Sequence, residues 1–406
     1  CLSTVDGRVL WKRRGGPNHE LVMGNGFCVS RWPARGGPVV LGDTVFFGAG
    51  IWPAEGVYIY ALDVATGAVR WLNRDSGTLR MSQPHGDVAE SGISAQGYLA
   101  ADSDRVYVPT GRAGPAALKR KDGTLNWFSM HAHSYHGGSD LVLAGDIYYV
   151  GGQAGYARTG GLRGAVRQDR VVQSTIPPYA LNTLVPLDSG PVHYDKGEVR
   201  SLRWEFGEKP NRKGEMVKTW LTPTDWAVTP PYGGAAMVAA SNVLVSAGPG
   251  RQEGTAGICL IDLTDKKVSW EASLDGTPYG LAIADSRLYV STDRGELVCF
   301  GPENASPNGS AQASAAPAGA GLPAATVEVA GAAKQILART GLRTGLCIDL
   351  GCGDGSLALE LARTSELRII AIDSDPAALG RARRVLTAAG LYGARVQVFK
   401  ADPAAS

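Results

Sequence analysis

The sequence of 406 residues predicts a multidomain protein in which an all-β region is followed by a partial α/β domain. Three observations support this prediction. A short motif recurs through the first three hundred residues, a stretch rich in Ala, Pro, Gly and Ser follows it, and the hydrophobic period then becomes helical. The 54 glycines exceed the usual share of ~7% without a collagen period, which is typical of many tight turns.

Composition and charge exclude several functional classes. The net charge of +2 gives no basis for predicting nucleic acid or an anionic membrane as a partner. The six cysteines include no CxxC pair, so neither a disulfide framework nor a zinc site is expected. No run of ~18 apolar residues occurs, and we therefore predict no membrane span.

One motif recurs in the first region: a short apolar stretch, a turn rich in Asp, Thr and Gly, and a strand that ends in Trp. Four copies are LSTVDGRVLW (2–11), ALDVATGAVRW (61–71), ALKRKDGTLNW (117–127) and LIDLTDKKVSW (260–270), and YDKGEVRSLRW (194–204) is a degenerate fifth. Such self-similarity indicates repeated supersecondary units.

A second element, an alternating strand pair around a turn, precedes most of the copies. Apolar runs that bracket Gly-Asp, Ser-Asp or Ser-Asn are a hairpin signal. A hairpin and the two strands of the motif make a four-stranded sheet, whose terminal Trp can pack into the next sheet. The pattern predicts a β-propeller with five to six visible blades. The five hairpins are at 39–50, 98–111, 141–152, 237–248 and 281–292.

The motif resembles the tryptophan-docking repeat of the pyrroloquinoline quinone (PQQ) propellers, over roughly residues 1–301. The resemblance implies a bacterial protein with more blades than are visible, so we expect a fragment with sequence missing before Cys1. Members of that family are either quinone-dependent dehydrogenases or scaffolds without a cofactor, such as the outer-membrane assembly lipoprotein.

Quinone chemistry is not the favoured interpretation of this propeller. The resemblance implies that a quinone enzyme needs a calcium site and adjacent cysteines, and neither is recognisable here. His131, His133 and His136 are close enough in sequence to bind a metal, but no carboxylate lies beside them, so we interpret them as polar residues of a loop. We therefore predict no metal site and no PQQ. A PQQ-dependent oxidoreductase remains an alternative.

Residues 153–231 look like a long excursion with few strand signals. Long inserts on a rigid scaffold often carry a binding surface. We expect a protein or small-molecule acceptor to bind on the propeller face or on this insert.

Residues 302–326 are rich in Ala, Pro, Gly and Ser and predict a flexible linker. The domain expected at 327–406 begins with a helix at 329–342. Strands at 346–350, 368–373 and 396–401 then alternate with helices at 357–364 and 376–389. This βαβαβ order predicts a parallel sheet of Rossmann-like type.

A glycine-rich loop lies at the first strand-to-helix turn, where nucleotides bind in such folds. Gly351, Gly353 and Gly355 permit a sharp turn and a close ligand approach. The dinucleotide pattern GxGxxG would need its third Gly at Ser356. Asp349 would repel a pyrophosphate but attract an ammonium or sulfonium group.

The strings DLGCGDGSLALELA and AIDSDPAAL resemble motif I and the acidic loop of class I S-adenosylmethionine (SAM)-dependent methyltransferases. The resemblance implies that Asp349 and the three glycines surround the amino-acid half of SAM. It places Asp373 at the ribose and Asp402 at the adenine. The implied cosubstrate-binding residues are Asp349, Gly351, Gly353, Gly355, Asp373 and Asp402.

The resemblance covers only the first half of such a domain, because class I methyltransferases have further strands that carry the acceptor site. We therefore expect a methyltransferase of unknown acceptor if the C-terminal half is present, and an inactive fragment otherwise. A non-catalytic envelope scaffold is the other interpretation. The propeller favours the periplasm or cell envelope, whereas SAM favours the cytoplasm, and the sequence leaves both open.

Overall fold

The computed structural model describes residues 1–3, 8–24, 27–83, 86–111, 113–128, 138–139, 141–150, 153–156, 166–167, 170–171, 183–211, 213–301 and 326–402. The chain forms two compact units. The first consists of Cys1–Pro17 and Trp32–Ala305, and the second of Asn18–Arg31 and Ser306–Ser406. The predicted linker at 302–326 lies, except for Thr326, outside the described residues.

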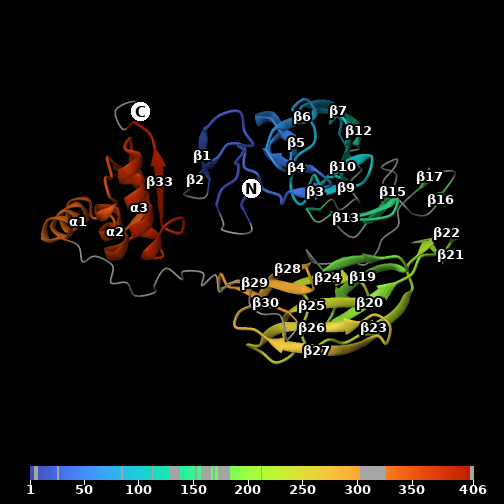
Figure 1. Cartoon of the computed structure of the whole chain (residues 1–406). Helices are drawn as coiled ribbons and strands as arrows, with labels where there is room; N and C mark the ends of the chain where they lie inside the picture. The colour runs from blue at the N-terminus through green and yellow to red at the C-terminus, as the bar shows by residue number, and fades with distance from the viewer. Residues whose placement is uncertain are drawn as a thin grey trace. The chain divides into compact units, whose positions relative to one another are not determined.

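The first unit is built from antiparallel sheets whose strands follow one another in sequence (Figure 1). Their innermost strands lie side by side in chain order, as in the predicted propeller. The part of the chain that the structure describes holds six such sheets, four with four strands and two with three. This agrees with the predicted five to six blades.

The strands of the six sheets have the following bounds. The first sheet contains β3 (Val39–Leu41), β4 (Thr44–Ala49), β5 (Tyr58–Asp63) and β6 (Val69–Asn73), and the second β9 (Ala100–Ala101), β10 (Arg105–Val108), β11 (Ala116–Lys119) and β12 (Leu125–Phe128). The third contains β13 (Leu141–Ala144), β14 (Ile147–Val150) and β15 (Gln153–Tyr156), and the fourth β18 (Leu184–Leu187), β19 (Gly190–Asp195), β20 (Glu198–Leu202) and β23 (Thr224–Val228). The fifth contains β24 (Ala236–Ala240), β25 (Val243–Pro249), β26 (Ala256–Asp262) and β27 (Lys267–Ser273), and the sixth β28 (Pro278–Ala284), β29 (Arg287–Thr292) and β30 (Leu297–Phe300).

Shorter elements lie in the connections between the strands of these sheets. They are the 3-10 helix η1 (Pro53–Glu55) and the hairpins β7 (Leu79–Ser82) with β8 (Val88–Ser91), β16 (Val166–Arg167) with β17 (Arg170–Val171), and β21 (Glu205–Pro210) with β22 (Met216–Leu221).

The Trp residues join neighbouring sheets, as the repeat predicts. The indole Nε1 of Trp71 donates to the backbone oxygen of Arg120, 2.8 Å away in the turn of the next sheet. Trp11 donates in the same way to Val64 at 3.0 Å. A Cβ on Gly123 would come within 2.4 Å of the Trp71 ring, and one on Gly67 within 2.6 Å of the Trp11 ring. In these two turns the glycine therefore makes room for the Trp of the preceding repeat.

The expected excursion at 153–231 is wrong in its second part, because residues 184–228 contain the fourth blade. Its hairpin β18–β19 carries Pro186 and Pro191, residues that weaken a strand signal. The outer-strand Trp of this blade is Trp226, which pairs with Ser201, and not Trp204 as the degenerate copy indicated. The β21–β22 hairpin, inserted between β20 and β23, displaces the outer strand along the sequence.

The second unit contains a three-stranded parallel sheet in the order β31 (Thr344–Leu350), β32 (Glu366–Asp373), β33 (Val396–Lys400). Helices α1 (Val327–Thr340), α2 (Ser356–Thr364) and α3 (Pro376–Ala388) alternate with the strands (Figure 1). The predicted βαβαβ order is confirmed. The hairpin β1 (Leu21–Gly24) with β2 (Phe27–Ser30) also belongs to this unit.

The helices cover one face of the parallel sheet. Thr326 caps α1 through its side chain, and Gly341 ends it in the left-handed conformation. Side chains from all three helices pack with alternate residues of the strands, such as Leu367, Ile369 and Val398, in one buried cluster. None of the helices in the described residues is long and apolar enough to cross a membrane.

Candidate cosubstrate site at the strand ends

The glycine-rich loop is fixed at the carboxyl end of β31. The backbone N–H groups of Gly351 and Cys352 both donate to the carbonyl oxygen of Ile372, at 2.8 and 3.0 Å. Gly355 N–H donates to Cys352, which closes the turn before α2 begins. The loop is thereby attached to the end of β32, and the strand ends that carry Asp349 and Asp373 lie next to each other.

The three glycines have different roles. All adopt positive φ, at 77° for Gly351, 55° for Gly353 and 80° for Gly355, which other residues rarely adopt. A Cβ on Gly351 or Gly353 would meet no atom within 4 Å, so these two leave open space for a ligand. A Cβ on Gly355 would approach Ala382 of α3 to 2.8 Å. Gly355 is therefore required for helix packing as well as for the turn.

Asp349 stands at the penultimate position of β31. Its Oδ2 is buried and has no hydrogen-bond partner. Burial raises the pKa of this carboxyl above its usual range, and the neighbouring charge of Asp373 raises it further. A half-buried acid whose oxygen lacks a donor is suited to receive a cationic or N–H-bearing ligand group.

Asp373, the last residue of β32, is held by backbone donors. Its Oδ2 accepts from Gly353 N–H and its Oδ1 from Asp375 N–H, each at 2.9 Å. These two hydrogen bonds lower the pKa of Asp373, which keeps it ionised at neutral pH. Each carboxylate oxygen can accept a further hydrogen bond, so the side chain can still bind a diol.

Asp402 lies two residues after β33 and is exposed. The preceding residue, Ala401, donates its N–H to the carbonyl oxygen of Asp373 at 3.1 Å. The three acids predicted from the sequence therefore lie at or just after the carboxyl ends of three adjacent parallel strands, at the same edge of the sheet.

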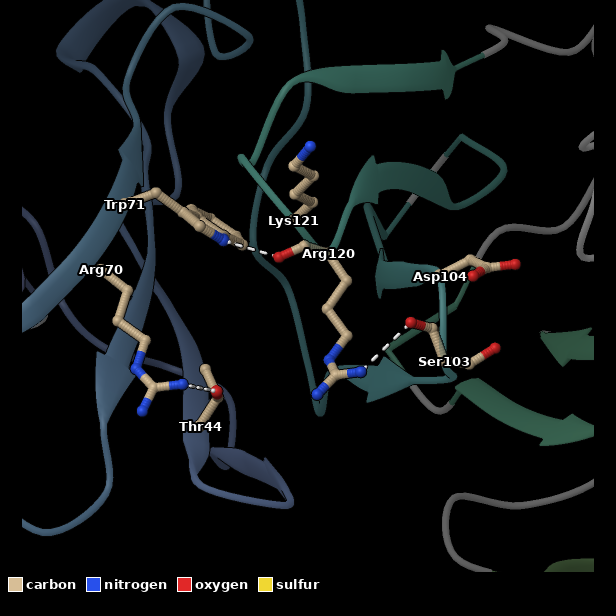
Figure 2. Close-up of a pocket in the computed structure, with 7 residues that line it drawn as sticks. All are labelled: Thr44, Arg70, Trp71, Ser103, Asp104, Arg120 and Lys121. Carbon is tan, nitrogen blue, oxygen red and sulfur yellow. Dashed lines mark hydrogen bonds between the residues drawn. The ribbon is translucent and has the colours of Figure 1, made fainter.

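The first unit has a pocket of about 330 Å³ between its first two blades, lined by Thr44, Arg70, Trp71, Ser103, Asp104, Arg120 and Lys121 (Figure 2). Two of its three cationic side chains, Arg70 and Arg120, are already engaged. Arg70 pairs with Asp43 and Asp63 at 2.7 Å, and Arg120 donates to the backbone oxygen of Ser103 at 3.1 Å. The Trp71 indole crosses the gap to Arg120, so the pocket is the groove in which a repeat docks.

Within the described ranges, no group of three or more His, Cys, Asp or Glu side chains is placed to hold a metal ion. The candidate loop with His131, His133 and His136 lies outside those ranges.

Comparison with known proteins supports the two-part organisation. Residues 1–189 match the family model described as outer membrane protein assembly factor BamB, whose repeats are of the PQQ type. Residues 347–405 match the model described as a methyltransferase domain. No curated protein matches the chain.

Solved structures similar to each part are known. A protein assigned as an S-adenosyl-L-methionine-dependent methyltransferase from Methanococcus maripaludis is 32% identical over 18% of this chain and 33% of its own, with a TM-score of 0.18. The chain thus spans about a third of that protein. BamB from Moraxella catarrhalis is 15% identical over 66% of this chain and 83% of its own, with a TM-score of 0.38. Quinohemoprotein alcohol dehydrogenase from Comamonas testosteroni is 14% identical over 72% of this chain and 59% of its own, with a TM-score of 0.40.

The matched ranges cover the first three blades of the first unit and, in the second unit, the glycine loop and the strand ends. The chain therefore combines a β-propeller of PQQ-type repeats with a methyltransferase domain.

Proposed function

We propose that the second unit binds SAM at the ends of β31, β32 and β33 and serves methyl transfer to an acceptor. The observation that carries the proposal is the unpartnered, buried Oδ2 of Asp349 beside a glycine loop with open space. SAM, when bound, supplies a methyl group on a positively charged sulfur. Its ammonium group would provide the donor that Asp349 lacks.

The remaining residues fit the same ligand. Asp373 is ionised and rigidly held, and its oxygens retain capacity for the two ribose hydroxyls. Gly351 and Gly353 would let the ligand approach the backbone, and Asp402 would face the adenine. A pyrophosphate would be repelled by Asp349, which argues against a dinucleotide. The contribution of this unit to catalysis is to bind and orient the methyl donor.

Calorimetric titration of the full chain with SAM, and separately with NAD, tests the proposal. We expect binding of SAM alone, and a loss of about tenfold to a hundredfold in affinity for Asp349→Asn, the value of one hydrogen bond to a charged group. Asp375→Asn is the matched control. It makes the same change of charge two residues from Asp373. Asn is as favourable an N-cap residue as Asp in general, and it keeps one of the two hydrogen bonds that Asp375 accepts from Ala377 and Ala378.

Two results would contradict the proposal. One is binding of NAD in preference to SAM. The other is SAM binding that Asp349→Asn and Asp375→Asn weaken equally, because that would make the effect one of general charge.

A further inference from the structure

The parallel sheet of the second unit has a second face, opposite the helices. Parallel sheets are normally covered on both faces, since their strands are apolar on both sides. Side chains of this far face alternate with those of the helix-side cluster and include Ile348 of β31, Ile370 of β32 and Gln397 of β33. No helix of the described residues covers this face in the way that α2 and α3 cover the other.

Coverage of the far face changes from one strand to the next. Ile370 is only 5% exposed, although it is not part of the helix-side cluster. Ile348, its register partner on β31, is 57% exposed. The far face is therefore covered at β32 but exposed to solvent at β31.

The covering element is the β1–β2 hairpin, which lies more than three hundred residues earlier in the chain. The amide of Gln397 makes two hydrogen bonds with the backbone of Cys28: its Oε1 accepts from the N–H at 2.9 Å and its Nε2 donates to the C=O at 3.0 Å. On β32, the guanidinium of Arg368 lies over the ring of Phe27, 4.6 Å from its centre.

These contacts have the character of a specific interface. A side-chain amide that both donates to and accepts from one residue imitates the next strand of a sheet, so it satisfies backbone groups that the hairpin leaves unpaired. The cation over the Phe27 ring adds an attraction that depends on direction. The base of the hairpin is closed by the ion pair of Arg31 with Glu20 at 2.7 Å.

We propose that residues 18–31 are the second covering layer of the methyltransferase sheet, and that β32 and β33 depend on this segment for their protection from solvent. The interaction surface consists of Phe27 and Cys28 on the hairpin and of Arg368, Ile370 and Gln397 on the sheet. The proposal concerns the fold of the unit and holds whether or not SAM binds, so the two can fail separately.

Hydrogen–deuterium exchange of the full chain, followed by mass spectrometry, tests this role. In Gln397→Ala, we expect the amide of Cys28 and those of β32 and β33 to exchange about tenfold faster, the effect of losing about one net hydrogen bond. Gln397→Glu keeps an acceptor for the Cys28 N–H but sets a carboxylate oxygen against the Cys28 C=O in place of the donor, so its effect should be no smaller than that of Gln397→Ala. Peptides from β26 and β27 in the first unit should not change in either variant.

Replacing residues 19–30 by a short Gly-Ser linker removes the layer altogether and should increase exchange at β32 and β33 further. The matched control replaces residues 80–90 of the β7–β8 hairpin, which belongs to the first unit, by the same linker. Unchanged exchange at β32 after removal of residues 19–30, or an equal increase in the control, would overturn the proposal.

Discussion

Replacing Asp349 with asparagine is expected to change stability and ligand affinity in opposite directions. In the ligand-free chain Oδ2 of Asp349 is buried without a donor, and Asp373 adds a like charge nearby. Burying an unsatisfied polar atom costs about 1–3 kcal/mol. The Asn side chain keeps the shape and removes the charge but retains polar atoms, so we expect the lower end, a gain of about 1 kcal/mol at neutral pH.

The pH dependence gives the sign of the effect. The pKa of Asp349 in the folded state is raised above the ordinary value of 3.8 by burial first and by Asp373 second. Such an acid contributes its full stability below pH 3.8, and that contribution is lost as the pH rises through the folded-state pKa. The advantage of Asp349→Asn over the parent chain should therefore be absent in acid and present at pH 7.

Urea titrations at several pH values, read by hydrogen exchange of β31 and β32 peptides, measure this difference. The backbone hydrogen bonds that lower the pKa of Asp373 are present in both variant and parent, so their contribution, which has the opposite pH dependence, is common to the two chains. The reasoning would be refuted by an Asn variant that is less stable than the parent at pH 7, or by an advantage that grows as the pH falls.

Three further predictions concern the first unit. Trp71→Ala should lower the free energy of unfolding by about 3–5 kcal/mol, and Trp71→Phe by less, in urea titrations followed by far-ultraviolet circular dichroism; equal losses would contradict docking through the ring. Gly123→Ala should destabilise more than Gly145→Ala, since both have positive φ but only the first would meet the Trp71 ring, and equal unfolding midpoints would exclude a steric role. His193 is buried with neither ring nitrogen bonded, and burial lowers its pKa below 6.5, so its stabilising contribution is present above pH 6.5 and lost as the pH falls through the folded-state value. In urea titrations at pH 7.5 and 5.5, the parent should lose more stability on acidification than His193→Phe, and a larger loss in the variant would contradict this.

The repeats and the glycine loop could be predicted because their signals are local. The Asp/Gly turns and terminal Trp of 61–71 and 117–127 specify hairpins within about ten residues, and the docking of Trp71 follows from them. The order of strands and helices in 344–400 likewise follows from short apolar runs and caps.

Long-range pairing could not be predicted in this way. Cys28 of the hairpin is hydrogen-bonded to Gln397, which lies 369 residues later in the sequence, and neither residue type indicates such a partner. Similarly, the paired residues Leu202 and Thr224 of the fourth blade are separated by 21 residues of sequence. Because of this separation, the sequence pattern did not identify Trp226 as the Trp of the outer strand. The lack of a donor at Asp349 Oδ2 depends on the packing around the strand end, which a sequence pattern does not encode.

The docking of Trp11, Trp71 and Trp226 against the turn of the next repeat makes neighbouring repeats energetically dependent. At the fifth blade the position of Gly67 and Gly123 is taken by Lys266, also at positive φ (58°), and its ammonium lies 5.4 Å from the centre of the Trp226 ring. A substitution of the Trp changes which residue is tolerated at the contacting turn position of the next repeat, and the reverse also holds. These two positions should therefore covary between adjacent repeats. In a single-molecule pulling experiment from either end, the blades should then detach one after another, each rupture releasing the next joint.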